Sequence, residues 1–145
     1  MNAPLYNSDI LRLAASIPHH KRLKDPQGSA EKRSPTCGSR VTVDVRLDRD
    51  GRLCDLGLEV RACALGQASA SLMAAHAMGK TQAELVTARD GLAAWLAGIS
   101  AETDFWPGFE VIAPARGYPA RHASIRLGFE AVAEAVAIAN EHSGS

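Results

Sequence analysis

The sequence of 145 residues has no net charge, few aromatic side chains and no long apolar run. Basic and acidic residues both number 16, and Phe, Trp and Tyr make up 5% of the chain. A balanced charge does not attract a polyanion and scarce aromatics offer few stacking platforms, so we expect no nucleic-acid binding. No run approaches the ~20 apolar residues that span a bilayer, and the N-terminus has no export signal. We therefore expect a cytoplasmic protein that binds no membrane.

Cysteine is scarce as well. The three cysteines, Cys37, Cys54 and Cys63, form an odd set in a chain without an export signal. This count argues against a disulfide framework, because such frameworks belong to exported proteins and use cysteines in pairs. Metal or sulfur chemistry is the remaining use of these thiols. With 46% hydrophobic residues, the composition fits a single domain over residues 1–145 with its own core.

Alternating apolar residues predict a β-hairpin in the first half of the chain. In Arg40–Leu47 the valines fall on one face and Thr42 and Asp44 on the other, which is typical of a half-buried strand. Asp50-Gly51 favours a hairpin turn, and Leu53–Arg61 supplies the returning strand. One face of this pair needs a covering layer.

Helical patterns supply that layer and predict an α+β fold, a small antiparallel sheet covered by helices. We expect a short helix capped by Ser8, an Ala-rich helix over Ala64–Met78, a third opened by the capping box Thr81–Glu84, and a long amphipathic helix over Arg121–Asn140. Two stretches have weaker patterns. The polar residues from His19 to Arg33 predict an exposed connection or a weak edge strand, and Ile99–Tyr118 a loose segment with one helical turn around Phe109–Ala113.

Two of the cysteines occupy positions suited to chemistry. Cys37 lies between Pro35 and Gly38 just before a strand, where a turn exposes the thiol. Cys63 falls between the returning strand and the Ala-rich helix, and a helix N-terminus favours the thiolate. The hairpin brings the two together. The alternative is that both are buried structural cysteines behaving as small hydrophobes.

The third cysteine and the histidines are weaker candidates. Cys54 lies just past the hairpin turn, far along the strand from Cys63, and we expect no role for it. His122 begins the last helix after the turn Pro119-Ala120-Arg121, where side chains often face a cleft. A structural role is the alternative for His122.

Four segments carry a resemblance to a known family, and together they cover nearly the whole chain. They are Pro35-Thr36-Cys37-Gly38 before a strand, Cys63 followed by Gln67–Met73, Gly79-Lys80, and Pro119-Ala120-Arg121 before the last helix. In this order and spacing they resemble the U-type iron–sulfur cluster assembly scaffolds, the NifU-like and IscU-like proteins, and especially the SufU branch. The segment Ile99–Tyr118 is similar to the longer loop of SufU-like members. The resemblance implies the IscU/SufU scaffold fold.

The resemblance also implies a ligand set that this sequence keeps only in part. In the family, three cysteines and an aspartate hold zinc or a nascent cluster. Cys37 and Cys63 match the first two cysteines, whereas the aspartate falls on Ser39 and the third cysteine on Ser124. The family histidine before the third cysteine falls beside His122, which could replace it only after a local shift.

The loss of two ligands limits what one chain can bind, because zinc and iron–sulfur sites depend on soft donors and a serine hydroxyl is a poor substitute. Cys37, Cys63 and His122 would form a metal site of three donors with one open position. Two chains, however, could supply four thiolates to one bridging [2Fe–2S] cluster, which allows a homodimer.

The resulting hypothesis is a non-enzymatic scaffold or sulfur acceptor in iron–sulfur cluster assembly. Cys37 would accept sulfur, Cys63 would be the second thiolate, and Arg121, Ser39 and Ser124 would support the site. The implied partners are a cysteine desulfurase and apo iron–sulfur proteins, and the implied cofactor is a transient cluster or zinc. Two alternatives stay open, a zinc-binding sulfurtransferase accessory similar to SufU and a degenerate paralogue that binds proteins without metal.

Overall fold

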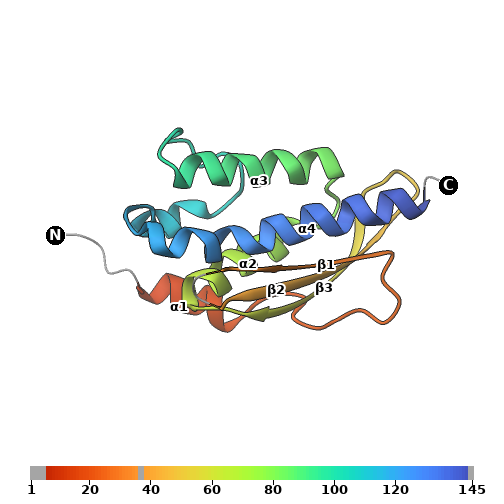
Figure 1. Cartoon of the computed structure of the whole chain (residues 1–145), viewed down its shortest axis with the longest axis horizontal. Coiled ribbons are helices and arrows are strands. Elements are labelled where there is room, and N and C mark those ends of the chain that lie inside the picture. Colours follow the sequence, from red (N-terminus) through yellow and green to blue (C-terminus); the bar gives the residue numbers. More distant parts are fainter. Residues whose placement is uncertain (1–5, 36–37, 144–145) are drawn as a thin grey trace.

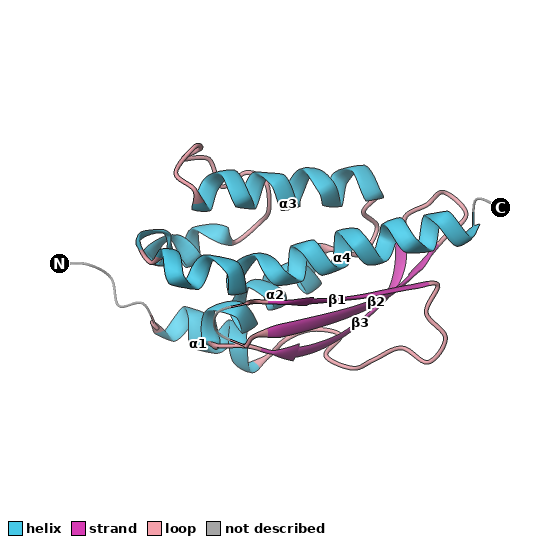
Figure 2. Ribbon diagram, in the orientation of Figure 1, coloured by secondary structure: helices cyan, strands magenta, loops and turns pink. Residues whose placement is uncertain are grey.

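The computed structural model describes residues 6–35 and 38–143, and within this range three strands and four α-helices form an α+β fold (Figure 1, Figure 2). The elements are α1 (Ser8–Ala15), β1 (Gly28–Arg33), β2 (Arg40–Leu47), β3 (Leu53–Arg61), α2 (Ala64–His76), α3 (Gln82–Leu96), the 3₁₀ helices η1 (Phe109–Gly117) and η2 (Pro119–Arg121), and α4 (His122–Ser143). The predicted fold class is therefore confirmed. In the described part of the chain, no helix is both long and apolar enough to cross a membrane.

The strands form one antiparallel sheet in the order β1-β2-β3. Both strands of the predicted hairpin have the expected bounds, and Arg40 pairs with Arg61 at its open end. Asp48 and Arg52 close the turn with a backbone hydrogen bond of 2.8 Å, and Gly51 takes a φ of 77° that a residue with a side chain would rarely adopt. The polar stretch from His19 to Arg33 ends in the edge strand β1, which confirms the expectation of an edge strand there.

One face of the sheet packs against helices. The valines of β2 have no exposed surface, and they lie beneath α4, whose apolar stripe is equally buried. The residues of this layer are Val41, Val43, Val45, Ile125, Phe129, Val132, Val136 and Ala139. Helix α2 packs beside α4, and α3 lies on the side of α4 away from the sheet (Figure 1). The apolar pattern of the last helix therefore predicted its packing correctly.

The opposite face of the sheet differs from the expectation, because Thr42 and Asp44 are buried there instead of solvated. The segment before β1 crosses this face, and a Cβ added to Gly57 would collide with the backbone of Lys21. Arg22 donates to Asp44 at 2.6 Å and 3.1 Å, and Ser29 donates to it at 2.6 Å. Period-two alternation cannot reveal such a cover, because the covering residues lie about twenty positions away in sequence.

Hydrogen bonds to Asp44 outweigh the cost of burying its charge. Burial acts to raise the pKa of this carboxyl, but hydrogen bonds from Arg22, Ser29 and the Leu23 amide lower it below its usual value. The carboxylate is thus ionised in the folded protein and ties the segment containing Arg22 to the middle of β2.

Helix ends follow the predicted signals, with corrections at three helices. The last helix, α4, covers His122–Ser143 and not the expected Arg121–Asn140. The first helix is capped by Asn7, whose side chain accepts from the Ile10 amide at 2.9 Å, and not by Ser8, which is its first residue. The Ala-rich helix ends at His76, two residues before the expected Met78. The capping box of α3 is confirmed, with both of its reciprocal hydrogen bonds present.

The segment expected to be loose is packed into the core. It forms the 3₁₀ helix η1 instead of one short turn, and Trp106, Phe109 and Ile112 are buried. The Trp106 indole donates to the Leu72 carbonyl at 2.7 Å, and its ring lies 5.1 Å from that of Phe129. The aromatic residues of this segment were a sequence signal for burial. The prolines and glycines among them favoured the interpretation as a loop.

Candidate functional site

The start of β2, the end of β3 and the start of α2 meet at the open end of the hairpin. The pairing of Arg40 with Arg61 places the start of β2 beside the end of β3, from which the chain passes directly into α2. Cys63 is the N-cap residue of α2, half-buried, and its carbonyl accepts from the Gln67 amide at 2.9 Å. The Gln67 side chain donates to the Ala62 carbonyl at 3.0 Å, which holds the junction between strand and helix.

Ser39 and Ser124 lie in direct contact although 85 positions separate them in sequence. The Ser124 hydroxyl donates to the Ser39 hydroxyl at 2.8 Å, and the two residues are only 1% and 4% exposed. These are the positions on which the resemblance placed the missing cysteine and aspartate. The structure therefore brings both changed ligand positions together in one buried spot.

Ser124 also packs against the beginning of α2, three residues after Cys63. A Cβ built on Gly66 would lie 3.4 Å from the Ser124 Cβ and 3.3 Å from its carbonyl oxygen. One turn further on, the Ser69 hydroxyl donates to the Ile125 carbonyl at 2.6 Å. Because α2 and α4 approach this closely, Cys63 and Ser124 stand at the same end of the fold.

The predicted sulfur acceptor, Cys37, lies outside the described residues. Its sequence neighbours belong to the connection between β1 and β2, which is closed by a backbone hydrogen bond of 2.9 Å from Ser34 to Ser39. The role of Cys37 stays a prediction from the sequence.

Cys54 has the position expected of a residue without a role in the site. It is exposed at the beginning of β3, whereas Cys63 follows the end of that strand. At about 3.3 Å per residue, the strand separates the two by about 20 Å.

The His122 ring contacts the backbone of η1. Its Nε2 lies 3.0 Å from the Arg116 carbonyl, and its ring lines a surface cavity together with Arg116, Pro119 and the end of α3. Cys63 and Ser124 do not line this cavity. His122 as third metal ligand stays a prediction, as does the supporting role of Arg121, which is half-buried one turn before Ser124.

The described donors do not fit a resident metal ion of four ligands. No group of three His, Cys, Asp or Glu side chains gathers in the described ranges 6–35 and 38–143. At this end of the fold they provide one thiol, Cys63, and two hydroxyls that bond to each other. Neutral hydroxyls are weak ligands for zinc and for iron–sulfur clusters, which take thiolates.

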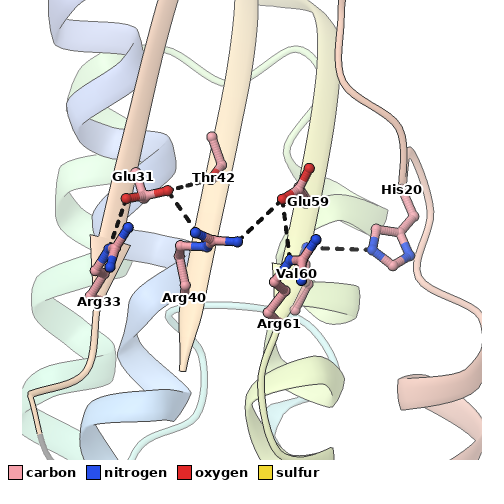
Figure 3. Close-up of polar contacts among 8 residues, drawn as sticks. All are labelled: His20, Glu31, Arg33, Arg40, Thr42, Glu59, Val60 and Arg61. Carbon is pink, nitrogen blue, oxygen red and sulfur yellow. Dashed lines mark hydrogen bonds and ion pairs between the residues drawn. The ribbon is translucent and has the colours of Figure 1, made fainter. Parts of the chain in front are cut away.

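A row of arginines beside the site was not anticipated. Arg33, Arg40 and Arg61 are direct cross-strand neighbours at the ends of the three strands (Figure 3). Glu31 and Glu59 stand two residues before Arg33 and Arg61 on their strands, on the same face. The hydrogen bond from Arg33, at 2.9 Å, lowers the pKa of the Glu31 carboxyl. The sequence did contain a signal. Arg40 directly follows Ser39 and Arg61 stands two residues before Cys63, while Arg33 directly precedes the connection that contains Cys37.

Comparison with known proteins identifies the family. Residues 5–102 match the model of the NifU-like N terminal domain. The crystal structure of a nitrogen-fixing NifU-like protein (N-terminal) from Brucella abortus is 40% identical over 94% of this chain and 95% of that chain, with a TM-score of 0.85. A putative scaffold protein for the SUF system from Fervidobacterium islandicum AW-1 shares the fold, with a TM-score of 0.83 at 20% identity over 91% and 96% of the two chains.

A curated relative agrees with this result. The iron–sulfur cluster assembly scaffold protein IscU of Streptococcus pyogenes serotype M1 is 29% identical over 73 residues. That match spans 50% of this chain and 45% of the relative, so the chain corresponds to less than half of that protein. The resemblance inferred from the sequence is confirmed, and the chain belongs to the NifU-like N-terminal domain family.

Proposed function

We propose that this protein serves in iron–sulfur cluster assembly as a scaffold or sulfur acceptor and catalyses no reaction of its own. The observation that carries the proposal is the contact between Ser39 and Ser124 at the helix end that begins with Cys63. This contact supports the proposal because it joins two positions that the family resemblance assigns to ligands, near the Cys63 thiol. Membership of the NifU-like family supports the same conclusion.

Sulfur acceptance needs only an accessible thiolate and a donor persulfide. In the proposed step the Cys37 thiolate attacks the outer sulfur of a persulfide on a cysteine desulfurase. The donor's S–S bond breaks, a new S–S bond forms on Cys37, and the donor leaves as a thiolate, so no external oxidant or reductant is consumed. Cys63 is the second thiol, and apo iron–sulfur proteins are the recipients. The proposed place of action is the cytoplasm.

The Ser39–Ser124 pair favours a second candidate strongly enough to test it. If the two hydroxyls mark chemistry that has been lost, the chain is a protein-interaction module without metal. The related alternative of a zinc-binding accessory similar to SufU is disfavoured by the same pair, because zinc in one chain would lack two of the family's four ligands.

Persulfide labelling separates these functions. We expect that incubation with a cysteine desulfurase and cysteine labels Cys37, that Cys37→Ser abolishes the label, and that the matched variant Cys54→Ser retains it. Mass spectrometry of the alkylated peptides measures each site. A protein that binds the desulfurase but carries persulfide on none of its cysteines would be an interaction module, whereas zinc that copurifies in a ratio near one per chain would favour the accessory.

A further inference from the structure

The exposed side of the sheet carries a row of like charges at its site end. Arg33, Arg40 and Arg61 face the same side and are paired across the strands (Figure 3). Their side chains are 66%, 28% and 69% exposed. Like charges directly opposite one another destabilise neighbouring strands. The row therefore depends on acidic side chains nearby to compensate its charge.

The two nearby glutamates compensate this charge incompletely. The Arg40 guanidinium lies 3.6 Å from one carboxylate oxygen of Glu31 and 3.6 Å from one of Glu59. Arg33 pairs with Glu31 at 2.9 Å, and Arg61 pairs with Glu59 at 3.4 Å. Three cations thus face two carboxylates. Exposed ion pairs of this kind contribute about 0–1 kcal/mol each, so carboxylates from another molecule can replace them at little cost.

The segment before β1 covers the middle of the outer face, and the exposed side chains of Arg33 and Arg61 lie at the end of that face. Further along the sheet, the segment containing Arg22 covers Asp44 and Gly57, and His19 and His20 bond to the amides of β3 along its edge. Figure 3 shows His20 beside Val60 at the edge of β3 and the arginine row running from there across the three strands.

The row also adjoins the site. Arg40 follows Ser39 directly, Arg33 precedes Ser34, and Arg61 stands two residues before Cys63. A protein docked on these side chains would therefore reach the helix end that carries the Cys63 thiol.

We propose that Arg33, Arg40 and Arg61 form a docking row for an acidic segment of a partner protein. This inference rests on the proposed function, because the partner would exchange sulfur or a cluster with this site. The guanidinium forks of Arg33 and Arg61 match carboxylates in bidentate geometry. A nucleic acid is the poorer match, because its binding depends on neutralising many phosphates and the chain has no net positive charge.

The test is a titration of the ¹⁵N-labelled full chain with a peptide of glutamates, followed through the arginine Nε–Hε resonances. We expect the signals of Arg33, Arg40 and Arg61 to shift, and that of Arg49, at the far end of the same sheet, to stay in place. The doubly substituted chain Arg33→Glu/Arg61→Glu should raise the apparent Kd by about tenfold or more.

Matched variants guard against a general charge effect. Arg49→Glu/Arg52→Glu changes the net charge equally at exposed positions in the β2–β3 turn, at the opposite end of the hairpin, and should alter the Kd by less than about twofold. Arg33→Gln/Arg61→Gln repeats the test without adding charge next to Glu31 and Glu59. Equal losses in the row and control variants would overturn the proposal, as would tighter binding of a thymidine oligonucleotide of the same charge at the row.

The titration contains no sulfur donor. If the peptide does not bind at the three arginines, the docking row is wrong and the proposed function is unaffected. If the wild-type chain accepts no persulfide, the proposed function is wrong and the docking row is unaffected.

Discussion

At the scale of single residues, the contact between Ser39 and Ser124 decides what the site can bind. Both hydroxyls are buried and hydrogen-bonded at the positions where the family resemblance places an aspartate and a cysteine. These hydroxyls are neutral and bind metal weakly, whereas zinc sites use thiolate, imidazole or carboxylate ligands and iron–sulfur clusters use mainly thiolates. A thiol at Ser124 and a carboxylate at Ser39 would therefore be the difference between a thiol site and the four-donor site that the resemblance implies.

Ser124→Cys is expected to tighten zinc binding by about tenfold or more, because it adds a soft anionic donor at the end of α2 that carries Cys63. A competition titration with a chromophoric zinc chelator measures the change. Thr87→Cys, which adds a thiol on the exposed side of α3, is the matched control and should show no gain. If the two variants bind zinc equally, Ser124 does not face the thiols.

At the scale of elements, one buried carboxylate ties the polar segment before β1 to the middle of the sheet. Asp44 has no exposed surface and accepts from Arg22, from Ser29 and from the Leu23 amide. The segment has few apolar residues of its own, so these hydrogen bonds fix its path across the outer face. That path also determines which part of the face stays open beside the arginine row.

Asp44→Asn is expected to lower the free energy of unfolding at pH 7 by about 2 kcal/mol, because the amide cannot replace the charge-assisted hydrogen bonds. The folded-state pKa of Asp44 lies below its unfolded value of about 3.9, so its contribution is present above that pH and is lost as the pH falls through the folded-state pKa. The difference between wild type and variant should therefore shrink below about pH 4.

Urea unfolding at several pH values measures this difference. Asp50→Asn, an exposed carboxylate in the β2–β3 turn, is the control and should change the free energy of unfolding by less than about 0.5 kcal/mol. A loss for Asp44→Asn that is as large at pH 3 as at pH 7 would show that folding does not lower the pKa of this carboxyl.

At the scale of the whole molecule, the number of thiols points to assembly. A single chain offers Cys37 and Cys63 where the family resemblance implies four ligands, and the described donors do not complete the set. Two chains together supply four thiolates, the number that a [2Fe–2S] cluster takes. A cluster carried as cargo would then be shared between two copies.

Anaerobic reconstitution with iron and sulfide is expected to yield one [2Fe–2S] cluster per two chains and a species of dimer mass. Metal and acid-labile sulfide analysis with native mass spectrometry measures both quantities. Cys63→Ser should lose the cluster and the dimer together, whereas Cys54→Ser should keep both. A cluster-loaded monomer would contradict this stoichiometry.

Comparison of the predicted and observed elements shows which signals are local. The bounds of β2 and β3 and the capping box at Thr81 agree with the sequence analysis, because alternation and capping act between residues a few positions apart. Burial of Asp44 and packing of Trp106 were missed, since their partners lie 22 and 34 positions away. The cap of the first helix was misplaced by one residue, as Asn7 and Ser8 are both suitable cap residues.

The sequence by itself determined the family, the hairpin and the identity of the donors, because these depend on residue type and on spacing along the chain. Only the tertiary structure decided that Ser39 and Ser124 bond to each other, and that His122 turns to the Arg116 carbonyl. It also aligned the three arginines beside the site through strand register. The physical reason is that contacts between distant segments depend on how whole elements pack, which no local pattern contains.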